Sequence, residues 1–175
     1  ITYRFVAARP MFYPARRPKT HMALIAEVDD RLWLCDLGFG SYGIRAPLAI
    51  DMTDTDIEQD FDTFRLIRDV NNEYLLQAKV EGAWANQYSF DLSPQEWIDF
   101  VPANYLNSTH PDAIFVQKLL IVQHAPEGRL ILLGNLLKTI TAEGIETQQL
   151  MDDGIALALK NRFALPVPQY IGKSA

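Results

Sequence analysis

Apolar and polar residues alternate through much of the first half of the chain, which is the pattern of short half-buried strands. The predicted strands cover residues 1–12, 20–28, 31–37, 63–68, 73–80 and 84–92. Turn residues separate them at short intervals, as in an antiparallel meander that forms a barrel or a sandwich. Residues 51–62 are acidic and short of large apolar side chains, so we predict a solvated connection there.

After Leu92 the pattern changes from the period of a strand to that of a helix. Residues 93–96 read Ser-Pro-Gln-Glu, which is a capping-box pattern with proline at the first helical position. A helix is therefore predicted to begin there. Asn107–Pro111 is predicted to be an irregular turn after this helix.

The last third of the chain predicts a second β block and a helix. Its predicted strands are 115–123, 129–133 and 136–141, and apolar residues then recur at helical spacing from Leu150 to Phe163. This order of elements favours the α+β class. We expect an antiparallel β-barrel at 1–92, a helical connector at 93–112 and a small α/β lid at 113–175.

Composition narrows the possible functions. The chain has 175 residues, 49% of them hydrophobic and 22% charged, so it can bury a core and is not a disordered tail. A net charge of -6 argues against nucleic acid as a partner. No apolar run reaches the roughly 18–20 residues of a membrane helix, so no membrane partner is expected. The single cysteine, Cys35, excludes an internal disulfide and favours a reducing, cytoplasmic compartment.

One predicted hairpin carries the clearest candidate chemistry. A two-residue turn at Asp29–Asp30 sets its register, and this register places Ala23 opposite Asp36. It also places Gly38 opposite His21, which leaves room over the imidazole. Because side chains alternate along a strand, His21 and Asp36 share a face as diagonal neighbours. Such neighbours lie about 7–8 Å apart at Cα, which lets the two side chains form a hydrogen bond.

A carboxylate on one ring nitrogen of a histidine leaves the other nitrogen free as a general base. Cys35 alternates with Asp36 and is predicted to face the other way, as a small packing residue. A histidine at a strand start and an aspartate before a glycine also serve structural roles, and the spacing leaves that alternative open. The three histidines and one cysteine show no metal-ligand spacing, so no metal is expected.

A basic, proline-rich loop at 14–19 precedes this hairpin. It reads either as a solvated surface loop or as a cationic collar for a phosphorylated ligand.

The hairpin and two later blocks resemble the arylamine N-acetyltransferase family. Residues 20–22 read Thr-His-Met before an apolar strand, and residues 33–40 read Trp-Leu-Cys-Asp-Leu-Gly-Phe-Gly, with the D-x-G-F-G signature of the family. The later blocks are Asp99–Phe100, Asn104–Leu106, Ser108–Pro111 and Phe115, and then Pro126–Arg129. The resemblance extends from about Tyr3 to Phe163.

The resemblance implies a three-part fold related to that of cysteine proteinases. In the family an N-terminal helical bundle carries the nucleophilic cysteine in an R-G-G-x-C motif, a β-barrel carries the histidine and aspartate, and an α/β lid follows. The 175 residues contain no R-G-G-x-C. The resemblance therefore implies that the cysteine lies before Ile1, in a helical bundle of the same protein, and that the chain by itself is inactive.

The implied reaction is ping-pong transfer of an acetyl group from acetyl-CoA to an arylamine or an N-hydroxyarylamine, through a Cys-His-Asp triad. In this reaction His21 would relay protons and Asp36 would orient the imidazole. Small aromatic amines and coenzyme A are the expected small-molecule partners.

The same resemblance assigns binding roles to five further residues. Phe39 would line the aromatic acceptor pocket, and Gly38 and Gly40 would let the backbone approach a ligand closely. Arg17 and Thr20 are the candidates to meet the coenzyme.

Departures from the family pattern keep other functions open. Asp112–Ile114 stand where the family often has a serine near the coenzyme, which allows a divergent acyl donor or an amide synthase that closes macrolactams in natural-product assembly. A truncated binding or regulatory module that kept the barrel is a second alternative. A different thiol acyltransferase or a transglutaminase-like enzyme is a third, because a Cys-His-Asp triad serves several reactions.

Overall fold

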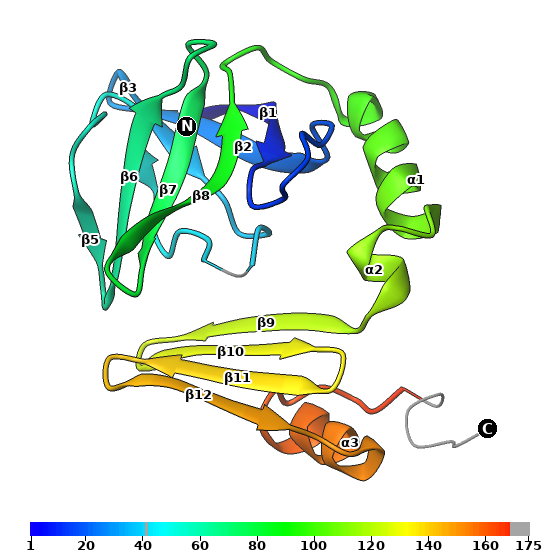
Figure 1. Cartoon of the computed structure of the whole chain (residues 1–175). Helices are drawn as coiled ribbons and strands as arrows, with labels where there is room; N and C mark the ends of the chain where they lie inside the picture. The colour runs from blue at the N-terminus through cyan, green and yellow to red at the C-terminus, as the bar shows by residue number, and fades with distance from the viewer. Residues whose placement is uncertain (41, 169–175) are drawn as a thin grey trace. The chain divides into compact units, whose positions relative to one another are not determined.

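A computed structural model describes residues 1–40 and 42–168. Residue 41 and residues 169–175, the end of the predicted lid, lie outside the described part. The chain divides into two units, 1–113 and 114–175, and each contains its own antiparallel sheet (Figure 1). Strands and a few helices together confirm the α+β class. The finer division at residues 92 and 112 stays a prediction.

The first unit is built on one curled sheet of eight antiparallel strands, in the order β4-β3-β2-β1-β8-β7-β6-β5 (Figure 1). The strands are β1 (Thr2–Pro10), β2 (His21–Val28), β3 (Arg31–Cys35), β4 (Leu48–Ala49), β5 (Ile57–Gln59), β6 (Asp62–Arg68), β7 (Tyr74–Val80) and β8 (Ala83–Phe90). The alternation seen in the sequence places one set of side chains inside, where removing apolar surface from water stabilises the curled sheet. This core includes Val6, Ile25, Leu34, Phe64, Leu66, Leu76, Tyr88 and Phe90.

The β2–β3 hairpin has the predicted register. Asp29 and Asp30 have φ angles of 51° and 59°, as the two central residues of a type I′ turn require. Val28 then pairs with Arg31, and Leu24 pairs with Cys35.

The helix after the sheet begins later than the capping pattern predicts. A short 3₁₀ helix, η1 (Trp97–Phe100), leads into α1 (Val101–Thr109). The capping box pairs Glu96 with Asp99, the side chain of each accepting from the backbone N–H of the other, rather than Ser93 with Glu96. The predicted turn at 107–111 is helical as far as Thr109. The hydroxyls of Ser108 and Thr109 donate to carbonyls one turn earlier.

The second unit contains a four-stranded sheet in the order β12-β11-β10-β9. Its elements are α2 (Ile114–Gln117), β9 (Leu120–Ala125), β10 (Gly128–Leu133), β11 (Leu136–Thr141), β12 (Gly144–Gln149) and α3 (Asp152–Asn161). The predicted strand at 115–123 is wrong in its first part, where α2 lies. β12 was not predicted, because all six of its residues are exposed and leave no alternation in the sequence.

The predicted terminal helix is confirmed as α3. Its Leu159, together with Phe163 beyond its end, packs against Leu132 and Leu137 of the sheet. Within residues 1–40 and 42–168, no helix is long and apolar enough to cross a membrane.

The acidic stretch 51–62 is not simply a solvated connection. It contains β5, and its Gln59 and Asp62 are buried. Arg45 Nε lies 2.7 Å from Asp62 Oδ2, with side-chain exposures of 7% and 9%. Gln59 Oε1 accepts hydrogen bonds from the backbone N–H of Arg45 at 2.7 Å and of Ala46 at 3.0 Å. Arg45, Asp62 and Gln59 therefore fix the end of the loop that follows the hairpin.

Replacing Arg45 with methionine should lower the free energy of unfolding by about 3–5 kcal/mol, because it leaves the buried Asp62 carboxylate without its cation. Denaturant unfolding of both proteins measures the difference. Arg31→Met is the matched control, since its pair with Asp51 is exposed and should contribute little. Equal losses in the two variants would contradict the prediction.

Candidate functional site

The hairpin brings His21 and Asp36 together on one face of the sheet. His21 Nε2 lies 2.7 Å from Asp36 Oδ2, as the predicted register requires. The His21 side chain is 15% exposed and the Asp36 side chain 1%. A neutral His21 would carry its proton on Nε2 and donate it to the carboxylate. Nδ1 is then the ring nitrogen that can take a proton from a ligand or a nucleophile.

Asp36 is held from a second direction by its own turn. Its Oδ1 accepts hydrogen bonds from the backbone N–H of Gly38 at 2.9 Å and of Phe39 at 3.1 Å. Burial acts to raise the pKa of Asp36, but the hydrogen bond and charge of His21, then Gly38 and Tyr88, outweigh burial and lower it. The carboxylate is therefore charged at neutral pH. A Cβ added to Gly38 would lie 4.0 Å from His21 Cε1, so the glycine does leave space beside the imidazole.

Aromatic rings surround the histidine. The Phe39 ring meets the His21 ring edge to face, with centroids 5.0 Å apart. The Tyr88 ring of β8 lies 5.3 Å from His21 and 4.8 Å from Phe39. Phe12 meets Phe39 at 5.9 Å and is itself exposed. The imidazole thus lies against an apolar aromatic wall, in which Tyr88 is fully buried, so Phe39 and Phe12 are the rings of the wall that offer surface to a flat ligand.

Tyr88 was missed by the sequence reasoning. It comes from a strand far along the chain, and nothing in its local pattern separates it from any other inward-facing residue. Burial, followed by the charge of Asp36, raises the pKa of Tyr88 well above its usual value, so the phenol keeps its proton. Its buried hydroxyl makes no hydrogen bond of ordinary geometry within the described residues, although it helps to lower the pKa of Asp36.

The other predicted site residues lie in the segments before β2 and after β3. Thr20 directly precedes His21, and its carbonyl accepts a hydrogen bond from Asn107 Nδ2 at 3.2 Å. The Arg17 guanidinium lies 4.6 Å from the centre of the Tyr13 ring. Gly40 has a φ of 67° and its carbonyl accepts a 2.6 Å hydrogen bond from the backbone N–H of Gly43, so it forms a tight turn after Phe39.

Cys35 is half-buried and is the last residue of β3, directly before Asp36, so alternation directs its side chain away from the pair. Its Sγ lies 3.8 Å from the Trp33 carbonyl. Burial raises the pKa of the Cys35 thiol, and a raised pKa means less thiolate at neutral pH. Cys35 lacks the environment of an activated nucleophile.

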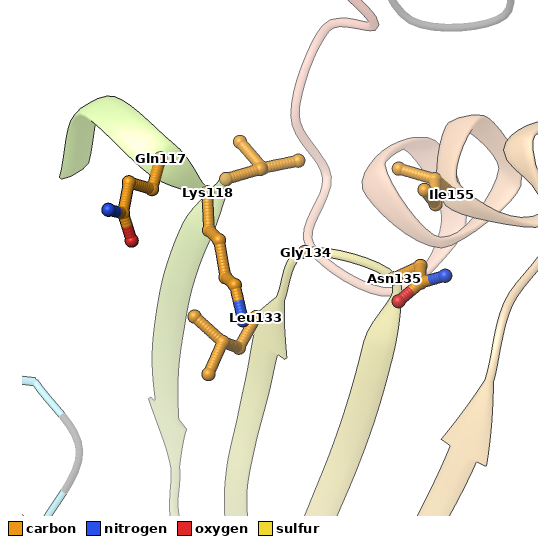
Figure 2. A pocket seen from close by; sticks show the side chains of 7 residues that line it. Gln117, Lys118, Leu133, Gly134, Asn135 and Ile155 are labelled. Carbon is orange, nitrogen blue, oxygen red and sulfur yellow. The ribbon is translucent and has the colours of Figure 1, made fainter. Parts of the chain in front are cut away.

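No group of three or more His, Cys, Asp or Glu side chains in the described residues could hold a metal ion. A cavity of about 350 Å³ lies in the second unit (Figure 2). It is lined by Gln117, Lys118, Leu119, Leu133, Gly134, Asn135 and Ile155. None of the predicted site residues lines this cavity.

Comparison with known proteins identifies the class. The N-acetyltransferase family model matches residues 4–171. The arylamine N-acetyltransferase of Escherichia coli K12 is 30% identical over 148 residues, which are 83% of this chain and 50% of that protein. The chain belongs to the arylamine N-acetyltransferase family.

Solved structures agree with this assignment. The arylamine N-acetyltransferase from M. tuberculosis superposes with a TM-score of 0.87 at 28% identity, over 94% of this chain and 63% of that one. The Mycobacterium marinum arylamine N-acetyltransferase in complex with CoA gives 0.86 at 27% identity, over 94% and 62%. The chain spans about half the length of the E. coli enzyme and under two thirds of these two structures.

Replacing Tyr88 with phenylalanine removes only the hydroxyl and should raise the pKa of Asp36, because one group that favours its charged form is lost. The lowered pKa of Asp36 stabilises the folded state. This contribution is complete above the ordinary carboxyl pKa of 3.8, and it is lost as the pH falls from there through the lowered pKa. In the variant this contribution should be smaller, and its loss should be complete at a higher pH.

Carboxyl ¹³C titration of Asp36 measures this shift. Tyr74→Phe is the control, since Tyr74 is also buried but stacks on Phe90. An unchanged Asp36 titration in Tyr88→Phe would exclude the Tyr88 hydroxyl from the site.

Proposed function

We propose that the protein transfers an acetyl group from acetyl-CoA to the nitrogen of an arylamine, or to the oxygen of an N-hydroxyarylamine, through a covalent thioester. The observation that carries the proposal is the 2.7 Å contact between His21 Nε2 and Asp36 Oδ2 on the face of the sheet lined by Phe39 and Tyr88. Membership of the family supports the same chemistry.

The first half-reaction forms the acetyl-enzyme. His21 Nδ1 takes the proton of a cysteine thiol, and Asp36 stabilises the imidazolium that results. The thiolate attacks the acetyl carbon of acetyl-CoA, a new C–S bond forms, and the bond between that carbon and the coenzyme sulfur breaks. The imidazolium returns its proton to the departing coenzyme thiolate, so charge and protons balance.

The second half-reaction transfers the acetyl group. The amine nitrogen attacks the thioester carbon while His21 accepts its proton, and the enzyme sulfur leaves as the thiolate of a thiolate–imidazolium pair. The aromatic wall gives the acceptor ring a place to lie. We assign Phe39 to this acceptor surface, with Gly38 and Gly40 allowing the ligand to approach the backbone.

We propose that the nucleophile comes from a part of the protein outside the 175 residues, in a helical bundle. Alternation at the end of β3 directs Cys35 away from His21, and burial raises the pKa of its thiol, so it does not fit the role. The length of the relatives leaves room for such a part. A protein whose only thiol here is unpaired also fits a cytoplasmic compartment.

We assign the coenzyme to the loop between β1 and β2, residues 11–20. Arg17 offers a guanidinium, which suits a phosphate, and Thr20 lies next to His21. One family member, from Mycobacterium marinum, has been solved in complex with CoA.

Replacing His21 with glutamine should lower kcat/KM for acetyl transfer to an arylamine at least about 10³-fold, because the thiol then has no base. The assay uses the protein together with the part that supplies the nucleophile, and follows release of coenzyme A. His110→Gln is the control, since His110 is exposed on the C-terminal side of α1. Cys35→Ser should keep full activity and leave the acetyl-enzyme, seen by mass spectrometry, unchanged.

Persisting activity in His21→Gln would remove His21 from the mechanism. Loss of the acetyl-enzyme in Cys35→Ser would make Cys35 the nucleophile. No transfer by the wild-type protein with any acyl donor and amine would favour the non-catalytic binding module instead.

Replacing Arg17 with alanine should raise KM for acetyl-CoA by roughly tenfold and change kcat little, because a charge-assisted contact with phosphate contributes similarly to substrate and transition state. Arg16→Ala, at the exposed neighbouring position, is the matched control. Steady-state kinetics with acetyl-CoA as the varied substrate measure both. Equal effects of the two variants would assign the contribution to the general charge of the loop.

A further inference from the structure

His21 stands at the very end of its strand. It pairs with Ala8 of β1, but pairing of β2 with β3 starts only at Leu24. The backbone of His21 is therefore held by one neighbouring strand, at the last position of the ladder. Strand ends open more readily than strand centres, whereas a proton-transfer group must be held to within about 0.5 Å. Something besides the ladder has to fix the entry into β2.

Lys19, two residues before His21, is tied to a cluster of polar groups on the sheet. Its Nζ binds Asp91 Oδ2 and lies 3.3 Å from Glu73 Oε1. The buried Ser89 donates its hydroxyl hydrogen to Glu73 Oε2 at 2.8 Å, which orients the Glu73 carboxylate toward the ammonium. The Lys19 side chain is 24% exposed and that of Glu73 15%, so the contact is only partly screened by water.

The Lys19 ammonium is the cation that contacts both carboxylates of this cluster. Asp91 has a pKa lowered to about 2; burial opposes this shift, and hydrogen bonds from Lys19 and Ser93 produce it. Asp91 is thus fully charged at neutral pH. Without the Lys19 ammonium, the carboxylates of Glu73 and Asp91 would both lose the cation that they contact.

A hydrogen bond from α1 holds the next residue, Thr20. Asn107 of α1 donates from Nδ2 to the Thr20 carbonyl at 3.2 Å. Residues 19 and 20 are therefore both anchored to elements far away in the sequence, immediately before the ladder of β2 begins.

We propose that Lys19 is a positioning residue for His21: its ion pairs with Glu73 and Asp91 fix the backbone at the start of β2, so that the imidazole stays in contact with Asp36. This inference rests on the proposed function for its importance to catalysis. The geometric part, an effect of Lys19 on the contact between His21 and Asp36, stands by itself.

The test observes the imidazole proton between His21 Nε2 and Asp36 Oδ2 by NMR, as a downfield N–H resonance. The chain has three histidines, and loss of the signal in His21→Gln assigns it. Lys19→Met keeps the length of the side chain but removes the charge. We expect exchange of this proton with water to become about tenfold faster, while amide exchange in β6 and β7 stays unchanged.

Two further variants separate positioning from other effects. Lys79→Met removes a lysine charge from the same sheet, where its 3.9 Å pair with Asp56 is exposed, and should leave the His21 proton unchanged. Lys19→Arg retains a cation for both carboxylates and should restore slow exchange.

An unchanged His21 proton in Lys19→Met would overturn the proposal. Faster exchange throughout β6 and β7 would also overturn it, because Lys19 would then act on general stability. Neither of these exchange measurements depends on acetyl transfer. A failure of the proposed function is therefore seen separately, as absence of activity in a protein whose His21 signal is intact.

Discussion

The site depends on one constraint, the two-residue turn at Asp29 and Asp30. Both residues lie in the left-handed region, and this turn fixes which residue of β3 faces which residue of β2. A shift of one residue would move every side chain of a strand to the other face. Asp36 would leave the imidazole of His21, and its backbone contacts with Gly38 and Phe39 would hold a carboxylate without a partner.

This dependence explains why the His21–Asp36 contact was predictable from the sequence. The turn and the alternation of the two strands are local features, and a two-residue turn places His21 and Asp36 on the same face. Tyr88 and Lys19 were not assigned to the site in the same way. Tyr88 reaches His21 through the pairing of β1 with both β2 and β8, and Lys19 finds its partners, Glu73 and Asp91, far along the chain. No short-range pattern in the sequence records either relation.

The errors of the sequence reasoning have related causes. β12 is exposed along its whole length, so it lacks the alternation that reveals a strand. The stretch 51–62 was predicted to be solvated because charged side chains are mostly exposed, but Asp62 is buried against Arg45. In both cases the missing information was a partner in space: a neighbouring strand for β12 and a guanidinium for Asp62.

Cys35, the last residue of β3, and Asp36, which follows it, show how the fold assigns chemistry to one face. Both are at least partly buried, and burial alone would raise the pKa of each. The pKa of Asp36 is lowered instead, because His21 and the turn supply hydrogen bonds to the charged carboxylate. Cys35 has only a backbone contact to offset burial, so its pKa stays raised. The charged carboxylate therefore serves the imidazole, and the neutral thiol on the other face does not. In the proposed function the imidazole held by Asp36 is the base, and the raised pKa of the Cys35 thiol is the physical reason why we propose a nucleophile from another part of the protein.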